Sequence, residues 1–263
     1  CGVTPDAKRA ASELLYKTWM AGDVIEALPA SMRPTTRSEG YEVQALLERK
    51  LGSLFGWKIA ATSLAGQNHI NVDGPLAGRI FASRVFGDGA IIPFGANRMA
   101  VAEAEFAFRM ARDLPPRDAE YSVDDVLDAV ASVHVGIEVP DSRYADFITV
   151  GAAQLIADNA CAHYFLAAPS TGTDWRRLDL AAHPVIARVE GKFERHGVGA
   201  NALGDPRVAL AWLVNELSRS GVTLRAGEMV TTGTCVQPLE IAPGDRVTVD
   251  LGIIGKASVS FGA

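Results

Sequence analysis

Glu103 and Glu105 stand two positions apart in residues 99–109, a segment that is otherwise apolar up to Arg109 at its end. On a β-strand alternate side chains share a face, so the two carboxylates would lie roughly 6.5–7 Å apart at the backbone. Like charges on one face repel each other, and burying them without a partner is costly. A hard divalent cation would compensate both charges and leave room for a third ligand. Arginine or lysine partners, or a solvated strand face, would explain the pattern as well.

Glu138 adds a third carboxylate in the same setting. In residues 133–139, Val and Ile alternate with His134, Gly136 and Glu138, so this acid also stands on the polar face of a strand whose other face is apolar. Three glutamates on two strands could form a set of oxygen ligands, which suits Mg²⁺ or Mn²⁺ rather than zinc. From the spacing alone, a salt bridge between Glu138 and Arg143 is an equally open alternative.

Lys58 is the only charged residue in the apolar segment 56–61. A desolvated lysine near carboxylates or a metal can act as an acid or base, although most such lysines extend their ammonium group to water. Asp73 lies in a Val-Asp-Gly-Pro turn, where aspartate has a purely conformational use. Segment 231–234, Thr-Thr-Gly-Thr, follows a predicted strand and offers hydroxyl and N–H groups to a carboxylate, or simply forms a turn.

The elements that must hold these residues change character near Gly56. Before it, apolar residues recur at helical spacing as far as Gly22, and a second helix is predicted over residues 38–51 with Ser38 as its N-cap. After it, glycines, prolines and short strands dominate. The predicted strands cover residues 56–61, 79–82, 90–93, 98–110 and 130–139, with several more in 229–261.

Two helices interrupt the β-rich part of the chain. One is predicted over residues 152–166, and the other over 206–219, with Asp205 as its N-cap. Helices followed by strands predict an α+β fold with a closed or rolled sheet. We expect a mainly helical N-terminal region over residues 1–66 and a β-rich catalytic domain over residues 67–263.

Composition excludes several classes of function. The chain has 263 residues, 25 of them basic and 31 acidic, which gives a net charge of −6 and argues against nucleic acid as a partner. Hydrophobic residues make up 48% and charged residues 21%, enough for a sizeable core. The sequence contains no run of about 18 apolar residues, so no membrane-spanning helix is predicted.

The cysteines and the remaining motifs exclude further kinds of site. Cys1, Cys161 and Cys235 are odd in number and far apart, which excludes a disulfide framework and a cysteine zinc site and fits a reducing cytoplasm. The glycine-rich segment 197–204 is not GxGxxG and lacks the lysine of a P-loop, so nucleotide binding is discarded. Ser63 has no nucleophile-elbow glycines around it.

Taken together, these segments resemble the 2-keto-4-pentenoate hydratase and 4-oxalocrotonate decarboxylase family, which lies within the fumarylacetoacetate hydrolase superfamily. The resemblance runs over nearly the whole chain, and the order and spacing of its motifs make it specific. They include Tyr41-x-x-Gln44, Gly56-x-Lys58-Ile59-x-x-Thr62-Ser63, Val72-Asp73-x-Pro75, Glu103-x-Glu105, Ile137-Glu138-Val139-x-Asp141-Ser142-Arg143, Ala157-Asp158-Asn159-Ala160 and Thr232-Gly233-Thr234.

The resemblance implies a fold of the fumarylacetoacetate hydrolase type, with a larger mixed β-roll or barrel-like domain. It also implies a role for each candidate residue. Cys161 stands where many relatives have serine, a stronger hydrogen-bond donor, so this position can change substrate preference or activity. The implied metal ligands for one Mg²⁺ or Mn²⁺ are Glu103, Glu105 and Glu138, the implied proton-transfer residues are Lys58 and Asp73, and the implied substrate contacts are Cys161, Thr232, Gly233 and Thr234.

The substrate that the resemblance implies is a short 2-hydroxy-2,4-dienoate from aromatic-ring degradation. The ion would act as a Lewis acid on this 2-keto acid, and water addition would give a 4-hydroxy-2-keto acid. The same site could instead decarboxylate 4-oxalocrotonate, or the chain could be a non-catalytic partner subunit. We favour the hydratase because it needs fewer special groups. The resemblance further implies a cytoplasmic homo-oligomer that can associate with a pathway enzyme, with no nucleic-acid or membrane partner.

Overall fold

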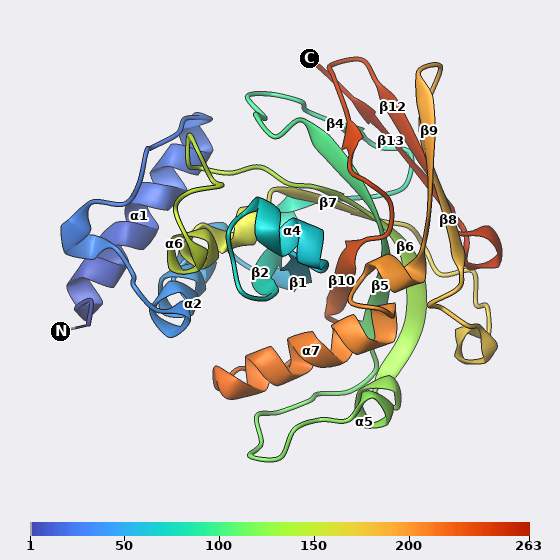
Figure 1. Cartoon of the computed structure of the whole chain (residues 1–263), viewed down its shortest axis with the longest axis horizontal. Coiled ribbons are helices and arrows are strands. Elements are labelled where there is room, and N and C mark those ends of the chain that lie inside the picture. The colour runs from blue at the N-terminus through green and yellow to red at the C-terminus, as the bar shows by residue number, and fades with distance from the viewer. Residues whose placement is uncertain (1) are drawn as a thin grey trace.

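The computed structural model describes residues 2–263 and contains two β-sheets, with helices beside the larger one (Figure 1). The large sheet is mixed and curled, with the strand order β2-β1-β10-β5-β6-β7-β3, and β11 pairs with β5 off this path. Its strands are β1 (Leu54–Ala60), β2 (Leu76–Phe81), β3 (Val85–Phe86), β5 (Val101–Met110), β6 (Val130–Val139), β7 (Tyr164–Ala167), β10 (Met229–Thr234) and β11 (Leu239–Glu240).

The second sheet has five strands in the order β4-β13-β12-β8-β9. They are β4 (Ile91–Ile92), β8 (Pro184–Val189), β9 (Phe193–Val198), β12 (Arg246–Asp250) and β13 (Lys256–Phe261). The helices are α1 (Pro5–Ala21), α2 (Arg37–Ala45), α3 (Glu48–Leu51), α4 (Leu64–His69), α5 (Val123–Leu127), α6 (Ala152–Ala157) and α7 (Pro206–Arg219). Short 3₁₀ turns are η1 (Ala30–Met32), η2 (Ala82–Arg84), η3 (Asn159–Cys161), η4 (Trp175–Arg177), η5 (Gly199–Asn201) and η6 (Gly252–Ile254). The prediction of an α+β fold is confirmed.

The main hydrophobic core lies between the two sheets and under α7. The apolar face of β5 enters it through Ala102, Ala104, Phe106 and Phe108, which are all fully buried. Valines of β8, β12 and β13 supply the opposite wall of the core. Because side chains alternate along β5, the other face of this strand carries Glu103 and Glu105, as predicted. The core therefore fixes the direction in which both carboxylates point.

The N-terminal helices pack with α6 beside the β2 edge of the large sheet (Figure 1). Helix α1 contacts α2, and α2 packs against α6. The predicted helix over residues 38–51 is interrupted: α2 ends at Ala45 and α3 begins at Glu48. Its N-cap is Thr36 rather than Ser38, because Thr36 and Glu39 form a reciprocal capping box.

The predicted helix over residues 152–166 is wrong in its second half. Helix α6 ends at Ala157, a left-handed turn occupies Asn159–Cys161, and the chain then enters β7, which pairs with β6. The predicted helix over 206–219 is confirmed, with Asp205 as its N-cap. The hairpin of β8 and β9 was not predicted.

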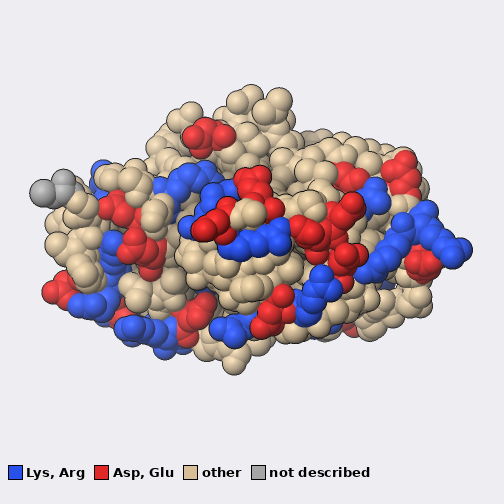
Figure 2. Space-filling model, turned by 90° about the horizontal axis from the view of Figure 1, so that it is seen from below, with Lys and Arg blue, Asp and Glu red and all other residues tan. Residues whose placement is uncertain are grey.

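The division of the chain at residue 66 stays a prediction. Strand β1, which lies on the N-terminal side of that boundary, is a member of the large sheet between β2 and β10. Cys161 and Cys235 are buried free thiols, and Cys1 lies outside the described residues. No helix within residues 2–263 is both long and apolar enough to cross a membrane. On the face drawn in Figure 2, basic and acidic side chains intermingle and form no separate basic area.

Candidate metal centre and active site

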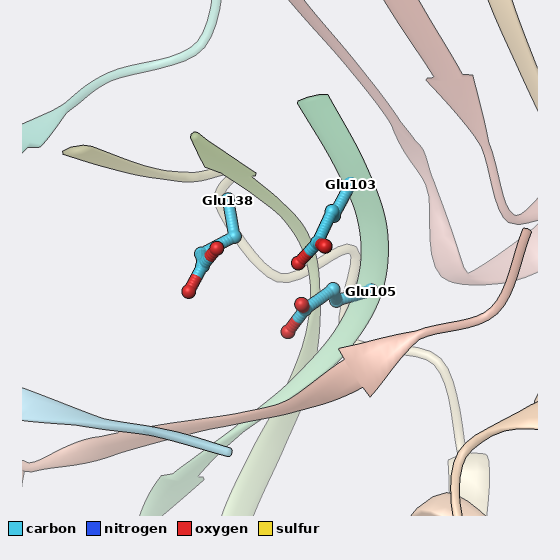
Figure 3. A group of neighbouring side chains, drawn as sticks. All are labelled: Glu103, Glu105 and Glu138. Carbon is cyan, nitrogen blue, oxygen red and sulfur yellow. The ribbon is translucent and has the colours of Figure 1, made fainter. Parts of the chain in front are cut away.

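Three glutamates meet on the face of the large sheet that is turned away from the main core. Strands β5 and β6 pair antiparallel, which places Glu103 directly opposite Glu138 and Glu105 opposite Gly136. One carboxylate oxygen from each glutamate lies within 4.8 Å of the other two. Figure 3 shows the three side chains converging from the two strands. The sheet register therefore brings together the three residues that were predicted as metal ligands.

The carboxylate oxygens of this cluster are poorly satisfied. The side chain of Glu105 is buried, and its Oε2 accepts hydrogen bonds from Thr231 Oγ1 and from the backbone N–H of Gly233, the latter at 3.0 Å. Its Oε1 has no hydrogen-bond partner among the described residues, nor has Glu138 Oε2, and the contact of Glu138 Oε1 is the ammonium group of Lys58. Buried polar atoms in proteins are normally paired, and an unpaired one costs about 1–3 kcal/mol, more when it is charged. These oxygens are available to a further ligand.

Lys58 provides the positive charge nearest to the glutamates. Strand β1 lies beside β10, with Lys58 opposite Thr231, so the lysine side chain enters the same face of the sheet. Its Nζ lies 2.6 Å from Glu138 Oε1 as an ion pair and donates a hydrogen bond to the carbonyl oxygen of Ala160 at 2.8 Å. Because Lys58 is only 3% exposed, its ammonium group does not extend to bulk water.

Burial and neighbouring charges shift the pKa values of the glutamates and of Lys58. Burial and the negative charge of Glu138 raise the pKa of Glu105 to about 7, against the opposing effect of its hydrogen bonds. Burial and the charges of Glu138 and Glu105 raise the pKa of Glu103 well above its ordinary value. Burial alone would lower the pKa of Lys58, but Glu138 and Glu103 outweigh it and raise that pKa to about 12. The single positive charge of Lys58 does not balance the three carboxyl groups.

The residues present fit a divalent cation. Three carboxylates face one ammonium group, and the unsatisfied oxygens are hard donors of the kind that Mg²⁺ prefers. Glu103, Glu105 and Glu138 would hold the ion. The alternative ion pair between Glu138 and Arg143 is not formed, because Arg143 pairs with the buried carboxylate of Asp158.

The other predicted site residues are arranged differently. The side chain of Asp73 is 89% exposed, its carboxylate lies 3.5 Å from Arg37 Nη1, and no hydrogen bond or ion pair within residues 2–263 joins it to Lys58. Cys161 is buried in the turn that contacts Lys58, and burial raises the pKa of its thiol to about 12. The roles of both residues stay predictions.

The threonine segment supports the cluster from β10. Thr232 Oγ1 donates to the carbonyl oxygen of Phe106 at 2.8 Å, and Thr234 Oγ1 donates to that of Val236 at 2.5 Å. The backbone N–H of Gly233 is occupied by Glu105. Contact of Thr232, Gly233 and Thr234 with a substrate stays a prediction. The sequence singled out Thr231 within a segment that could offer hydroxyl groups to a carboxylate, but not that this carboxylate is Glu105.

A narrow cleft adjoins the cluster. Lys58 and Glu138 line it together with Arg84, His163 and Tyr164. Burial and the positive charge of Arg143 lower the pKa of His163 to about 3, so this imidazole is neutral. The Arg84 guanidinium lies over the Tyr164 ring, 5.1 Å from its centroid, and has no carboxylate partner among the described residues. The cleft therefore contains an unneutralised cation.

Comparison with known proteins identifies the family. The fumarylacetoacetate hydrolase C-terminal family matches residues 75–261. A 2-keto-4-pentenoate hydratase of Paraburkholderia xenovorans (strain LB400) is 30% identical, over 98% of this chain and 96% of the relative. A 2-hydroxyhexa-2,4-dienoate hydratase of Comamonas testosteroni is 29% identical over 94% of each chain.

A solved structure agrees with these relatives. The 4-oxalocrotonate decarboxylase from Pseudomonas putida G7, complexed with magnesium and adipate, superimposes with a TM-score of 0.89 over 98% of each chain at 26% identity. The full-length relatives are named as hydratases and this structure as a decarboxylase, and both kinds of enzyme are lyases. The chain belongs to the fumarylacetoacetate hydrolase family, in the group of 2-keto-4-pentenoate hydratases and 4-oxalocrotonate decarboxylases, and is a lyase.

Proposed function

We propose that this protein is a metal-dependent hydratase that adds water to a short 2-hydroxy-2,4-dienoate and forms a 4-hydroxy-2-keto acid during the degradation of aromatic compounds. The observation that carries the proposal is the group of unsatisfied carboxylate oxygens on Glu105 and Glu138, with Glu103 beside them and Lys58 against them. The full-length relatives, which are named as hydratases of this substrate type, support it.

The metal ligands in this proposal are Glu103, Glu105 and Glu138, with Mg²⁺ or Mn²⁺ as the ion. When bound, the ion would act as a Lewis acid toward the carboxylate and the 2-oxygen of the substrate. The solved decarboxylase structure is complexed with magnesium, which supports the choice of a hard divalent cation. The proposal includes assembly into a homo-oligomer, which the family resemblance implies.

Lys58 is the proposed proton-transfer residue. Its Nζ is buried beside Glu138, so it can exchange a proton with a substrate bound at this face of the sheet without competition from bulk water. Asp73 is proposed as its partner when the substrate is bound. Thr232, Gly233 and Thr234 are proposed as contacts for the substrate carboxylate, and Cys161 as a contact for its chain.

Decarboxylation of 4-oxalocrotonate is the second candidate, and two observations favour it. The decarboxylase superimposes on nearly the whole chain. In addition, the Arg84 guanidinium lines the same cleft as Lys58 and has no acidic partner among the described residues, so it would suit a second carboxylate on the substrate. An apolar substituent would gain nothing from this cation.

One assay separates the two reactions. Freshly generated 2-hydroxypenta-2,4-dienoate and 4-oxalocrotonate are each added to the Mg²⁺-loaded protein, and the loss of each chromophore is followed together with CO₂ release. We expect turnover of the dienoate to the 4-hydroxy-2-keto acid. Turnover of 4-oxalocrotonate alone, with CO₂ release, would refute the hydratase and establish the decarboxylase.

A further inference from the structure

The turn η3 has a backbone conformation that its residues disfavour. Asn159, Ala160 and Cys161 have φ angles of +59°, +51° and +61°, and none of them is glycine. Left-handed backbone brings the Cβ atom too close to the following carbonyl group, so each of these residues is strained. Three strained residues in succession persist only where the surrounding structure holds them, and such segments cluster at functional sites.

The Asn159 side chain holds the turn against the sheet. This amide is fully buried; its Nδ2 donates to the carbonyl oxygen of Arg79 at 2.8 Å, and its Oδ1 accepts from the Arg79 N–H at 2.6 Å. Strand β2 is the end strand of the large sheet, so the Asn159 amide takes the place of a neighbouring strand there. The approach is close: a Cβ atom at Gly78 would lie 2.5 Å from the Asn159 carbonyl oxygen.

The turn η3 also holds the Lys58 side chain in position. The Ala160 carbonyl oxygen accepts the hydrogen bond from Lys58 Nζ, whose other close contact is Glu138 Oε1. A Cβ atom at Gly78 would also lie 3.0 Å from Lys58 Cδ, so this glycine leaves room for the lysine stem and for the turn together. A long flexible side chain is thereby fixed at its tip by a carbonyl oxygen that would point elsewhere in an ordinary helix.

We propose that Asn159 is a positioning residue, which sets the left-handed turn so that the Ala160 carbonyl oxygen holds the Lys58 amine against Glu138. Its effect on turnover rests on the proposed function, because it assumes that Lys58 transfers a proton. Its effect on the position of Lys58 does not. The two consequences are therefore measured separately.

The test compares Asn159→Gly with the control Gln44→Ala. Glycine tolerates the positive φ, so this variant removes the two amide hydrogen bonds without adding strain. Gln44, on α2, is also a fully buried amide: its Nε2 donates to the carbonyl oxygens of Ala77 and Ile156, and its Oε1 accepts from the Arg79 side chain, whereas Asn159 binds the Arg79 backbone. Among the described residues, no hydrogen bond joins Gln44 to η3 or Lys58. Asn159→Asp, which keeps only the acceptor for the Arg79 N–H, serves if Asn159→Gly does not fold.

Two readouts are taken for each folded variant at one pH. The first is the rate at which an amine-acylating reagent modifies Lys58, followed by peptide mass spectrometry with and without Mg²⁺. The second is kcat and KM with the substrate that the wild-type protein turns over. In Asn159→Gly we expect Lys58 to be modified at least tenfold faster, and kcat to fall about 10–100-fold with KM changed less than threefold. In Gln44→Ala we expect a loss of thermal stability with both readouts within threefold of wild type.

Each outcome decides one of the two claims. Unchanged modification of Lys58 in Asn159→Gly, or equal acceleration in Gln44→Ala, overturns the positioning role whatever happens to kcat. Faster modification confined to the Asn159 variants supports it. Faster modification with unchanged kcat supports the positioning role and contradicts the proton-transfer role of Lys58, which belongs to the proposed function.

Discussion

Glu103 and Glu138 are direct cross-strand neighbours on β5 and β6. Like charges in this position destabilise a sheet, yet the only cation that contacts Glu138 among the described residues is Lys58. Both glutamates are set by strands that the main core holds in place, so neither can move away by rearranging a loop. The sheet therefore maintains a repulsion that a bound divalent cation would remove.

Glu103→Gln should have opposite effects with and without metal. In EDTA the folded wild-type protein must either keep Glu103 protonated or bear a charge that Glu138 and Glu105 repel, and glutamine removes both costs. We therefore expect a gain of up to about 1 kcal/mol, which is roughly 2–4 °C in melting temperature for a chain of this size. With Mg²⁺ present the substitution removes a ligand, and the melting temperature should fall below that of wild type. Thermal scans under both conditions measure this. A variant that is destabilised equally with and without Mg²⁺ would show that the carboxylate has only a structural use.

Lys58→Met should abolish turnover and leave the metal bound. Methionine fills a similar volume but carries no proton, so we expect kcat to fall about 10²–10⁴-fold at saturating Mg²⁺. Affinity for Mn²⁺ should not decrease, because the substitution removes a cation that competes for Glu138. Steady-state kinetics and a Mn²⁺ titration measure the two effects. Full turnover by this variant would contradict the acid–base role.

The contribution of Glu103 and Glu105 to the stability of the metal-free protein should decrease as the pH rises from about 4.5 to about 7. The folded pKa of Glu105 is about 7 and that of Glu103 is also raised, so in this range the folded state keeps protons that the unfolded state releases. The share of the free energy of unfolding that these two carboxyl groups contribute then decreases with pH, by an amount on the order of 2–4 kcal/mol.

Urea denaturation in EDTA at several pH values measures this dependence. Glu105→Gln is the matched variant, and its stability should fall less over the same range because it has no proton to release at this position. Saturating Mg²⁺ should weaken the dependence in the wild-type protein, since the ion takes the place of the protons. If the stability of wild type and of Glu105→Gln changed with pH in parallel, the folded protein would not raise the pKa of Glu105.

Glu39→Gln should destabilise the N-terminal helices at neutral pH and have little effect in acid. The Glu39 carboxylate accepts hydrogen bonds from the backbone N–H groups of Thr35 and Val3, at 2.8 and 2.9 Å, and these lower its pKa to about 2. A lowered folded pKa gives stability that is present above about pH 4.5 and is lost as the pH falls toward 2.

We expect the substitution to cost about 1–2 kcal/mol at pH 7, as for the loss of a helix cap. The difference between wild type and variant, measured by urea denaturation, should shrink below pH 4.5. A difference that stays constant down to pH 3 would mean that the charge of Glu39 is not what stabilises the helix start.

Local sequence patterns predicted the faces of the strands but not how the strands meet. The alternation in residues 98–110 and 130–139 placed Glu103, Glu105 and Glu138 on polar faces, and the structure agrees. That Glu103 lies opposite Glu138 depends on the register between β5 and β6, which two separate patterns do not specify. The position of Lys58 depends in the same way on the parallel pairing of β1 with β10.

The left-handed turn had only a weak signal in the sequence. Residues 152–166 are mainly apolar, and Asp158 and Asn159 give the signal for a break after Ala157, whereas the next two positive φ angles fall on Ala and Cys rather than on glycine. The structure forms the turn through a distant partner, the backbone of Arg79, which helical spacing cannot reveal. The contact between this turn and Lys58 was missed for the same reason.

Calorimetric titration of the EDTA-treated, dialysed protein with Mn²⁺ tests the central claim, that Glu103, Glu105 and Glu138 form one divalent-cation site. We predict saturable binding of one ion per chain to the wild-type protein, and about 10–100-fold weaker binding to Glu105→Gln. Absence of saturable heat with the wild-type protein, or equal affinity of the two proteins for Mn²⁺, would contradict the account.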